Sequence, residues 1–158
     1  MFSFLRRRRE LREARTKIGV DLHRQIREAL TRDDLGASQK LSSAFTTGYI
    51  YTFVRDAFMS LGLDASKDLD SHIRFICDGV LPGKLYKIYS DQGAALALAR
   101  EMQDQDKEIR GTGLSPSAVT KLFMCGARSG SYDAPLVSIQ STPPDNLRRY
   151  LLDETTKS

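Results

Sequence analysis

The sequence of 158 residues has few of the side chains on which enzyme sites and disulfide scaffolds depend. It contains no Trp, two Cys and two His. Cys77 and Cys125 are far apart and form no close-spaced pair of the kind that binds zinc or performs thiol redox chemistry. We therefore predict that both are small core residues in a reducing compartment, with a disulfide between them as the alternative in an oxidising one.

Long apolar runs are also missing. No stretch approaches the roughly 20 apolar residues that a membrane-spanning helix needs. The first five residues are mainly apolar, but arginines follow them, which reverses the order of charge and apolar stretch in a secretory signal. The expected location is the cytoplasm, with contact at the inner face of a membrane as an alternative.

The sequence does contain enough apolar material for one domain. Hydrophobic residues make up 41% and charged residues 28% of the chain, which is ordinary for a globular protein and unlike a disordered one. We predict a single soluble helical domain over residues 1–158. It comprises a basic amphipathic helix over 1–30, a helical body over 31–154 and a frayed tail over 155–158.

Positive charge is concentrated near the start of the chain. The net charge is +4, but residues 1–30 carry nine basic and four acidic side chains, a difference of +5, which leaves −1 for the rest. In the same segment, apolar residues recur at multiples of about 3.6 residues and form one stripe: Phe4, Leu11, Ile18, Leu22, Ile26 and Ala29. This pattern predicts a long helix, for which Gly19 is the expected point of any break.

The spacing of apolar side chains along the rest of the chain predicts an all-α fold of about five to seven helices. Further helices are expected over 41–61, 64–80, 90–109, 115–126 and 142–151. The helix over 41–61 has apolar and aromatic groups on nearly all sides, so it should be central, and Gly62 should end it. Residues 84–89 are too short to separate helix from strand, with helix preferred. Residues 126–142, rich in Gly, Ser and Pro, predict one irregular loop with a short strand at 136–139.

The strongest functional feature is an arginine run behind an apolar tip. Its candidate residues for binding an anionic surface or a protein partner are Phe2, Phe4, Leu5, Arg6, Arg7, Arg8, Arg9 and Arg12. Guanidinium groups pair with anionic lipid, acidic side chains or phosphates, and Phe and Leu suit a membrane interface. Nucleic acid is the less favoured partner, because no helix-turn-helix, zinc-finger or stacking-aromatic pattern accompanies the arginines. A solvated basic helix is the simpler alternative.

A row of small residues lies on one face of the helix expected over 41–61. Ala44, Gly48 and Thr52 are spaced four apart, and small side chains let two helix backbones approach closely. The row predicts a helix–helix interface, either with another helix of this chain or in a homodimer. The interface within the chain is favoured, because tertiary packing stabilises most helices.

Asp68 and His72 form the one further candidate polar site. They are four residues apart on a predicted helix, so their side chains can meet, and a histidine beside a carboxylate can act as a base or a ligand. A hydrogen-bonded histidine at the edge of the core explains the same residues. No further ligands can be placed, so no metal and no other cofactor is expected.

Three other motifs lack the residues that their chemistry requires. The acidic run at 104–108 begins like a calcium loop but has no glycine at the sixth position. The glycines in 111–116 precede a helix but come without the lysine of a phosphate-binding loop. Ser129 and Ser131 are not part of a nucleophile-elbow pattern.

These observations favour a small intracellular helical protein-interaction or regulatory module without catalytic activity of its own. The first alternative is a peripheral membrane or anionic-surface module that binds through the Phe, Leu and Arg segment at the start of the chain. The second alternative is an enzyme with a site near His72.

Overall fold

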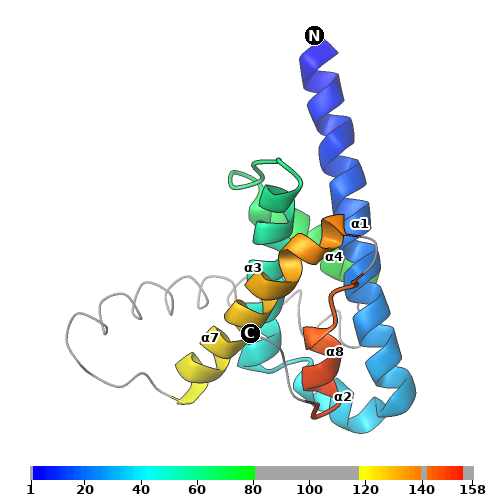
Figure 1. The fold of residues 1–158 in the computed structure, drawn as a ribbon, viewed down its shortest axis with the longest axis vertical. Helices are drawn as coiled ribbons and strands as arrows, with labels where there is room; N and C mark the ends of the chain where they lie inside the picture. The colour runs from blue at the N-terminus through cyan, green and yellow to red at the C-terminus, as the bar shows by residue number, and fades with distance from the viewer. Residues whose placement is uncertain (1, 81–117, 140–141, 155–158) are drawn as a thin grey trace, which may run out of the picture.

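The computed structural model describes residues 2–80, 118–139 and 142–154 (Figure 1). Within these ranges the chain is all-α, as the sequence predicts, with six α-helices, one 3-10 helix and no strand. The predictions for 84–89, 90–109, 104–108 and 111–116 lie outside the described residues.

Helix α1 (Phe2–Arg32) is the longest element and continues without a break through Gly19. The long helix is confirmed and has no break at Gly19, because one glycine among good helix formers costs a helix only about 1 kcal/mol. The C-terminal part of α1 lies against the other helices, while its first turns project beyond them (Figure 1). The apolar stripe is confirmed by the buried residues Ile18, Leu22, Ile26 and Ala29.

Polar residues start the next two helices. Asp33 caps α2 (Asp34–Lys40), where its carboxylate accepts a hydrogen bond from the Gly36 amide at 3.1 Å. Ser43 caps α3 (Ala44–Ser60) through its hydroxyl group. Helix α3 packs against α1, α4 (Leu69–Val80), α7 (Ala118–Asp133) and the 3-10 helix η1 (Ala134–Ser138). It is buried on nearly all sides, as predicted for a central helix.

Helix α3 ends at Ser60, and Gly62 forms the turn that stops it, as predicted. The Gly62 amide donates to the Met59 carbonyl at 2.9 Å, and the Leu63 amide donates to the Phe58 carbonyl at 2.9 Å. Gly62 has a φ of 74°, a conformation that favours glycine because it has no Cβ. This turn leads into α4 (Leu69–Val80), whose buried face is made of Leu69, Ile73, Ile76 and Cys77.

Helix α7 (Ala118–Asp133) and the 3-10 helix η1 (Ala134–Ser138) correct the prediction of an irregular loop over 126–142. Helix α7 does not end near Gly126, and the strand expected at 136–139 is absent. The last helix, α8 (Asn146–Leu151), forms as predicted. Pro143 and Pro144 lie before its first residue rather than in its first turn.

Close packing of α7 on α3 explains why the glycine-rich segment is helical. A methyl group at Gly126 would overlap the carbonyl oxygen of Phe45, and one at Gly48 would overlap that of Phe123. Gly130 repeats this relation one turn later on α7. The glycines therefore let the two backbones touch, and this tertiary contact outweighs their low helix propensity.

The predicted row of small residues lies in this same contact. Ala44 packs on Phe123 and Ala127 of α7, Gly48 lies directly beneath α7, and Thr52 is buried. The structure thus places the row against a helix of the same chain, and a homodimer would need a different surface.

The two cysteines have different environments. Cys77 in α4 is buried, as predicted, and burial raises the pKa of its thiol to about 12. Cys125 is exposed, so the prediction of a core position is wrong for this residue, because Phe123 and Ala127 occupy the buried face of α7. Both thiols are free.

The glycine contact predicts a large difference between two glycine-to-alanine substitutions. Gly126→Ala should lower the free energy of unfolding by about 1–3 kcal/mol, because the added methyl group meets backbone that cannot move aside. Gly19→Ala is the matched control: its methyl group would meet only Ile76, at an ordinary 3.8 Å, so it should raise stability by up to about 1 kcal/mol. Urea denaturation followed by circular dichroism measures the free energy of unfolding of both variants. Equal changes in the two variants would show that the contact between α3 and α7 does not depend on a glycine at position 126.

Candidate functional site

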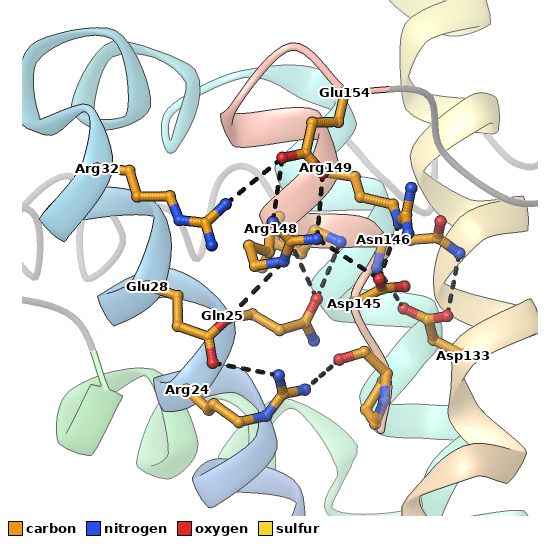
Figure 2. Close-up of polar contacts among 12 residues, drawn as sticks. Arg24, Gln25, Glu28, Arg32, Asp133, Asp145, Asn146, Arg148, Arg149 and Glu154 are labelled. Atoms are coloured by element: carbon orange, nitrogen blue, oxygen red, sulfur yellow. Dashed lines mark hydrogen bonds and ion pairs between the residues drawn. The ribbon is translucent and has the colours of Figure 1, made fainter. Parts of the chain in front are cut away.

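A connected set of buried polar side chains lies where α1, α3, α7 and α8 meet. Figure 2 labels Gln25, Asp133 and Asn146 of this set. Gln25 donates through Nε2 to the Tyr49 hydroxyl at 3.0 Å, and that hydroxyl donates to an Asp133 carboxylate oxygen at 2.7 Å. Asp133 also accepts hydrogen bonds from the backbone and side-chain N–H groups of Asn146, at 2.8 and 3.0 Å. We call these four residues the polar cluster.

The polar cluster caps the start of α8. Gln25 Oε1 accepts hydrogen bonds from the amides of Leu147 and Arg148, at 2.9 and 3.3 Å. Asp145, the residue before the helix, makes no side-chain capping bond. The first amides of α8, which have no partner within the helix, are thus satisfied by side chains from α1 and α7.

The polar cluster has the properties of a structural network. Burial raises the pKa of Asp133, and the hydrogen bonds from Tyr49 and Asn146 oppose this rise. Burial and the nearby Asp133 charge raise the pKa of Tyr49 well above its usual value, which keeps the hydroxyl protonated as a donor. All four members are 0% exposed and bonded to one another, so they fix the mutual positions of four helices.

Replacing Gln25 tests this role. Gln25→Met should lower the free energy of unfolding by about 1–3 kcal/mol, because the first amides of α8 lose their acceptor and the Tyr49 hydroxyl loses one of its two hydrogen bonds. Gln39→Met, at an exposed position of α2, should change stability by less than about 0.5 kcal/mol. Urea denaturation of both variants makes the comparison, and a Gln25→Met protein as stable as the control would show that the cluster is dispensable.

The candidate binding site lies on the outside, between the N-terminal half of α1 and the segment that joins α3 to α4. It is an open groove with a cavity volume of about 1090 Å³. Its basic side chains are Arg7, Arg8, Arg9, Arg12, Arg15 and Lys67. The lining also contains two carboxylates, those of Asp64 and Asp68, so its formal charge is +4. Leu5, Leu11 and Ala65 add apolar surface. We call this the basic groove.

Helix α1 supplies one wall of the basic groove. Arg8, Arg12 and Arg15 are four and three residues apart, so they lie along one face of the helix over about 10 Å. Arg7 bonds to the opposite wall, donating to the Asp64 carbonyl oxygen at 3.3 Å. The helix therefore repeats positive charge along the length of the groove.

Two arginines of the predicted run form ion pairs along the helix. Arg6 pairs with Glu10 and Arg9 pairs with Glu13, both at 2.8 Å. The hydrogen bond that Arg9 donates to Glu13 raises the pKa of Arg9. The side chains of Arg6 and Arg9 are 82% and 81% exposed, so these pairs contribute little to stability and leave both arginines accessible to a partner.

Arg15 and His72 line the inner end of the basic groove, nearest the helical body. The guanidinium carbon of Arg15 lies 3.4 Å from the centroid of the Phe75 ring, and the centroids of the His72 and Phe58 rings are 4.9 Å apart. Arg15 Nε and His72 Nδ1 are buried, and neither has a hydrogen-bond partner among the described residues. Burial lowers the pKa of His72, the charge of Arg15 lowers it further, and Asp68 opposes both.

The structure joins two candidate sites that the sequence kept apart. Leu5, Arg7, Arg8, Arg9 and Arg12 line the same groove as Asp68 and His72, whereas Arg6 does not line it. For Phe2 and Phe4 the structure describes the helical backbone but not the side chains. The hydrogen bond between Asp68 and His72 joins backbone groups, from the His72 amide to the Asp68 carbonyl at 3.0 Å, and their side chains interact through charge.

Sequence reasoning missed two basic residues of the groove, Arg15 and Lys67. Arg15 carried a usable signal, because it continues the row of Arg8 and Arg12 along one helix face. Lys67 carried none, since its distance from α1 depends on how the turn after α3 folds back.

Comparisons of the chain with protein-family models, curated proteins and solved structures found no match. Among the described residues, no group of three or more His, Cys, Asp or Glu side chains is placed to bind a metal ion. In the same ranges, none of the helices combines the length and apolar character needed to cross a membrane. The class defined by the fold and the site is an all-α protein with a basic groove beside a projecting helix.

The surroundings of His72 predict two opposite pKa changes. Arg15→Gln should raise the pKa of His72, because it removes a repelling charge, and Asp68→Asn should lower it, because it removes an attracting one. In the wild-type chain the pKa should lie below 6.5. NMR titration of the imidazole C–H resonances measures these values, with Asp78→Asn on the same helix as the control. A wild-type pKa above 6.5 would contradict the described environment.

Proposed function

We propose that this chain is a protein-interaction module whose basic groove binds an acidic segment of a partner protein. The observation that supports this is the composition of the groove, in which six basic side chains stand against two carboxylates beside apolar residues. Complementary charge speeds association and selects the partner, while apolar contacts slow dissociation. Helix α1 holds its arginines in a fixed row, which reduces the entropy lost when a partner binds.

The shape and charge pattern of the groove favour a protein segment over a membrane surface or a nucleic acid. The basic side chains line a concave surface, whereas a bilayer presents a broad face. Asp64 and Asp68 would repel a continuous polyanion but can pair with a basic residue in a mixed sequence. Hydrogen bonds from the Ser66 hydroxyl and amide lower the pKa of Asp64, helped by Arg7 and Lys67, so this carboxylate stays ionised.

A helical or extended acidic segment fits these features. Carboxylates spaced one helical turn apart would pair with Arg8 and Arg12, which are themselves one turn apart. Apolar side chains between the carboxylates would cover Leu5, which is 58% exposed, and the half-buried Leu11. This is the binding mode of an amphipathic segment in a groove, with charge on the rim and apolar contact between.

Peptide display on the full chain tests the proposal. A random peptide library panned against the wild-type chain should become enriched in Asp and Glu interleaved with Leu and Ile. Replacing Arg8 and Arg12 by Gln should weaken binding of the enriched peptides roughly tenfold, because each exposed ion pair contributes up to about 1 kcal/mol. Fluorescence polarisation at low and at physiological salt measures the affinity, which should fall as salt rises.

The matched control replaces the exposed Arg27 and Arg128 by Gln, which changes the net charge equally but away from the groove. This control should keep the affinity within about twofold of wild type. Equal losses in the two double variants would show that attraction is not confined to the groove. Tighter binding to phosphatidylserine vesicles or to duplex DNA than to any enriched peptide would overturn the assignment of a protein partner.

A further inference from the structure

We propose that the inner end of the basic groove holds a phosphate monoester, carried by a phosphorylated serine or threonine of the docked segment. The residues that would contact it are Arg12, Arg15, Ser71 and His72, which line the groove together. This inference rests on the proposed function and adds to it the chemical group that the partner presents.

The first observation is a pair of buried nitrogen atoms in need of a partner. Arg15 Nε is a hydrogen-bond donor, and His72 Nδ1 is a donor in the protonated ring and in one of the two neutral tautomers. Both are buried, both belong to residues that line the groove, and neither is hydrogen-bonded among the described residues. Buried polar groups in proteins are nearly always hydrogen-bonded, so a small rotation of the side chains that cover these two atoms would let a ligand oxygen at this end complete the pattern.

The second observation is that the Arg15 side chain is held in place. Its guanidinium carbon lies 3.4 Å from the centroid of the Phe75 ring, a contact that orients the planar group. Stacking uses the face of the guanidinium and leaves its edge for hydrogen bonds. An arginine fixed in this way offers two parallel N–H groups to a phosphate and loses little side-chain freedom on binding.

The third observation is the excess of positive charge at this end. Arg12 lies one turn before Arg15 on the same helix face, and Lys67 lines the groove with them. Ser71 brings a hydroxyl in the first turn of α4, a helix of 12 residues whose N-terminus carries partial positive charge. Asp68 is the opposing carboxylate, and the charges of Arg12 and Arg15 outweigh it.

A phosphate monoester matches this set better than a carboxylate does. It carries a charge of about −1.5 to −2 at neutral pH and has three acceptor oxygens. A carboxylate has a single charge and two oxygens, which one arginine satisfies. The groove therefore suits a peptide segment that has acidic residues along the segment and a phosphate group at the inner end of the groove.

The test uses the full chain and a short peptide of Glu, Leu and Ala with one central serine, in unmodified and phosphorylated forms. By isothermal titration calorimetry, the phosphorylated form should bind at least about tenfold more tightly. In the Arg15→Lys variant this preference should fall to within about twofold, because lysine keeps the charge but lacks the planar fork. Arg27→Lys is the matched control and should retain the preference. Equal binding of both peptides to the wild-type chain would overturn the inference and leave the docking proposal intact.

A second arm separates the two proposals when neither peptide binds. Inorganic phosphate is titrated alone while the imidazole resonances of His72 are followed by NMR, and circular dichroism confirms that each variant is folded. A saturable shift in the wild-type chain that disappears in Arg15→Lys supports the phosphate site and counts against acidic docking. Absence of a shift overturns both. Stronger binding to phosphatidic acid vesicles than to the phosphopeptide would assign the site to a lipid headgroup and overturn the peptide source.

Discussion

The hydrogen bonds that converge on Tyr49 and Asp133 are the constraint on which the arrangement of the helices depends. A carboxylate with no exposed surface is tolerated only when its oxygens are satisfied, and Asp133 finds its donors on α3 and α8. Helix α8 in turn has no capping side chain of its own and depends on Gln25 of α1. The network is complete only when all four helices are in place, so it selects one arrangement among the many that apolar packing alone would permit.

The same constraint determines where the basic groove can form. Gln25 fixes the position of α1 along its own axis, and the stripe from Ile18 to Ala29 is then buried against the body. Helix α1 is longer than the body that it packs against, so its first turns extend past the other helices (Figure 1). The arginines lie on this extension, beside the turn between α3 and α4. One part of α1 thus carries the interior polar network and contributes to stability, and another part carries the exterior charge and the proposed binding surface.

How far the sequence alone predicts this molecule can be judged from particular residues. Gly62 was recognisable as a helix end because it follows a complete apolar pattern, and the structure gives it a positive φ. Gly126 and Gly130 are also glycines, but neither of them ends a helix. A glycine can end a helix or admit a neighbouring backbone, and only the presence of Phe45 and Tyr49 of α3 across the contact distinguishes the two. The loop predicted over 126–142 was wrong for this reason.

The sequence by itself determined the all-α class, the long basic helix and its buried stripe, because helical periodicity is a property of residues three and four apart. Tertiary structure alone decided which of these elements share a site. Arg7 and the Asp64 carbonyl are 57 positions apart, and Gln25 and the Leu147 amide are 122 apart, yet each pair forms a hydrogen bond. Contacts over such separations follow from how the helices pack, which local spacing does not encode. The projecting arginines and the Asp68–His72 pair were therefore visible as two features in the sequence and became one groove only in the fold.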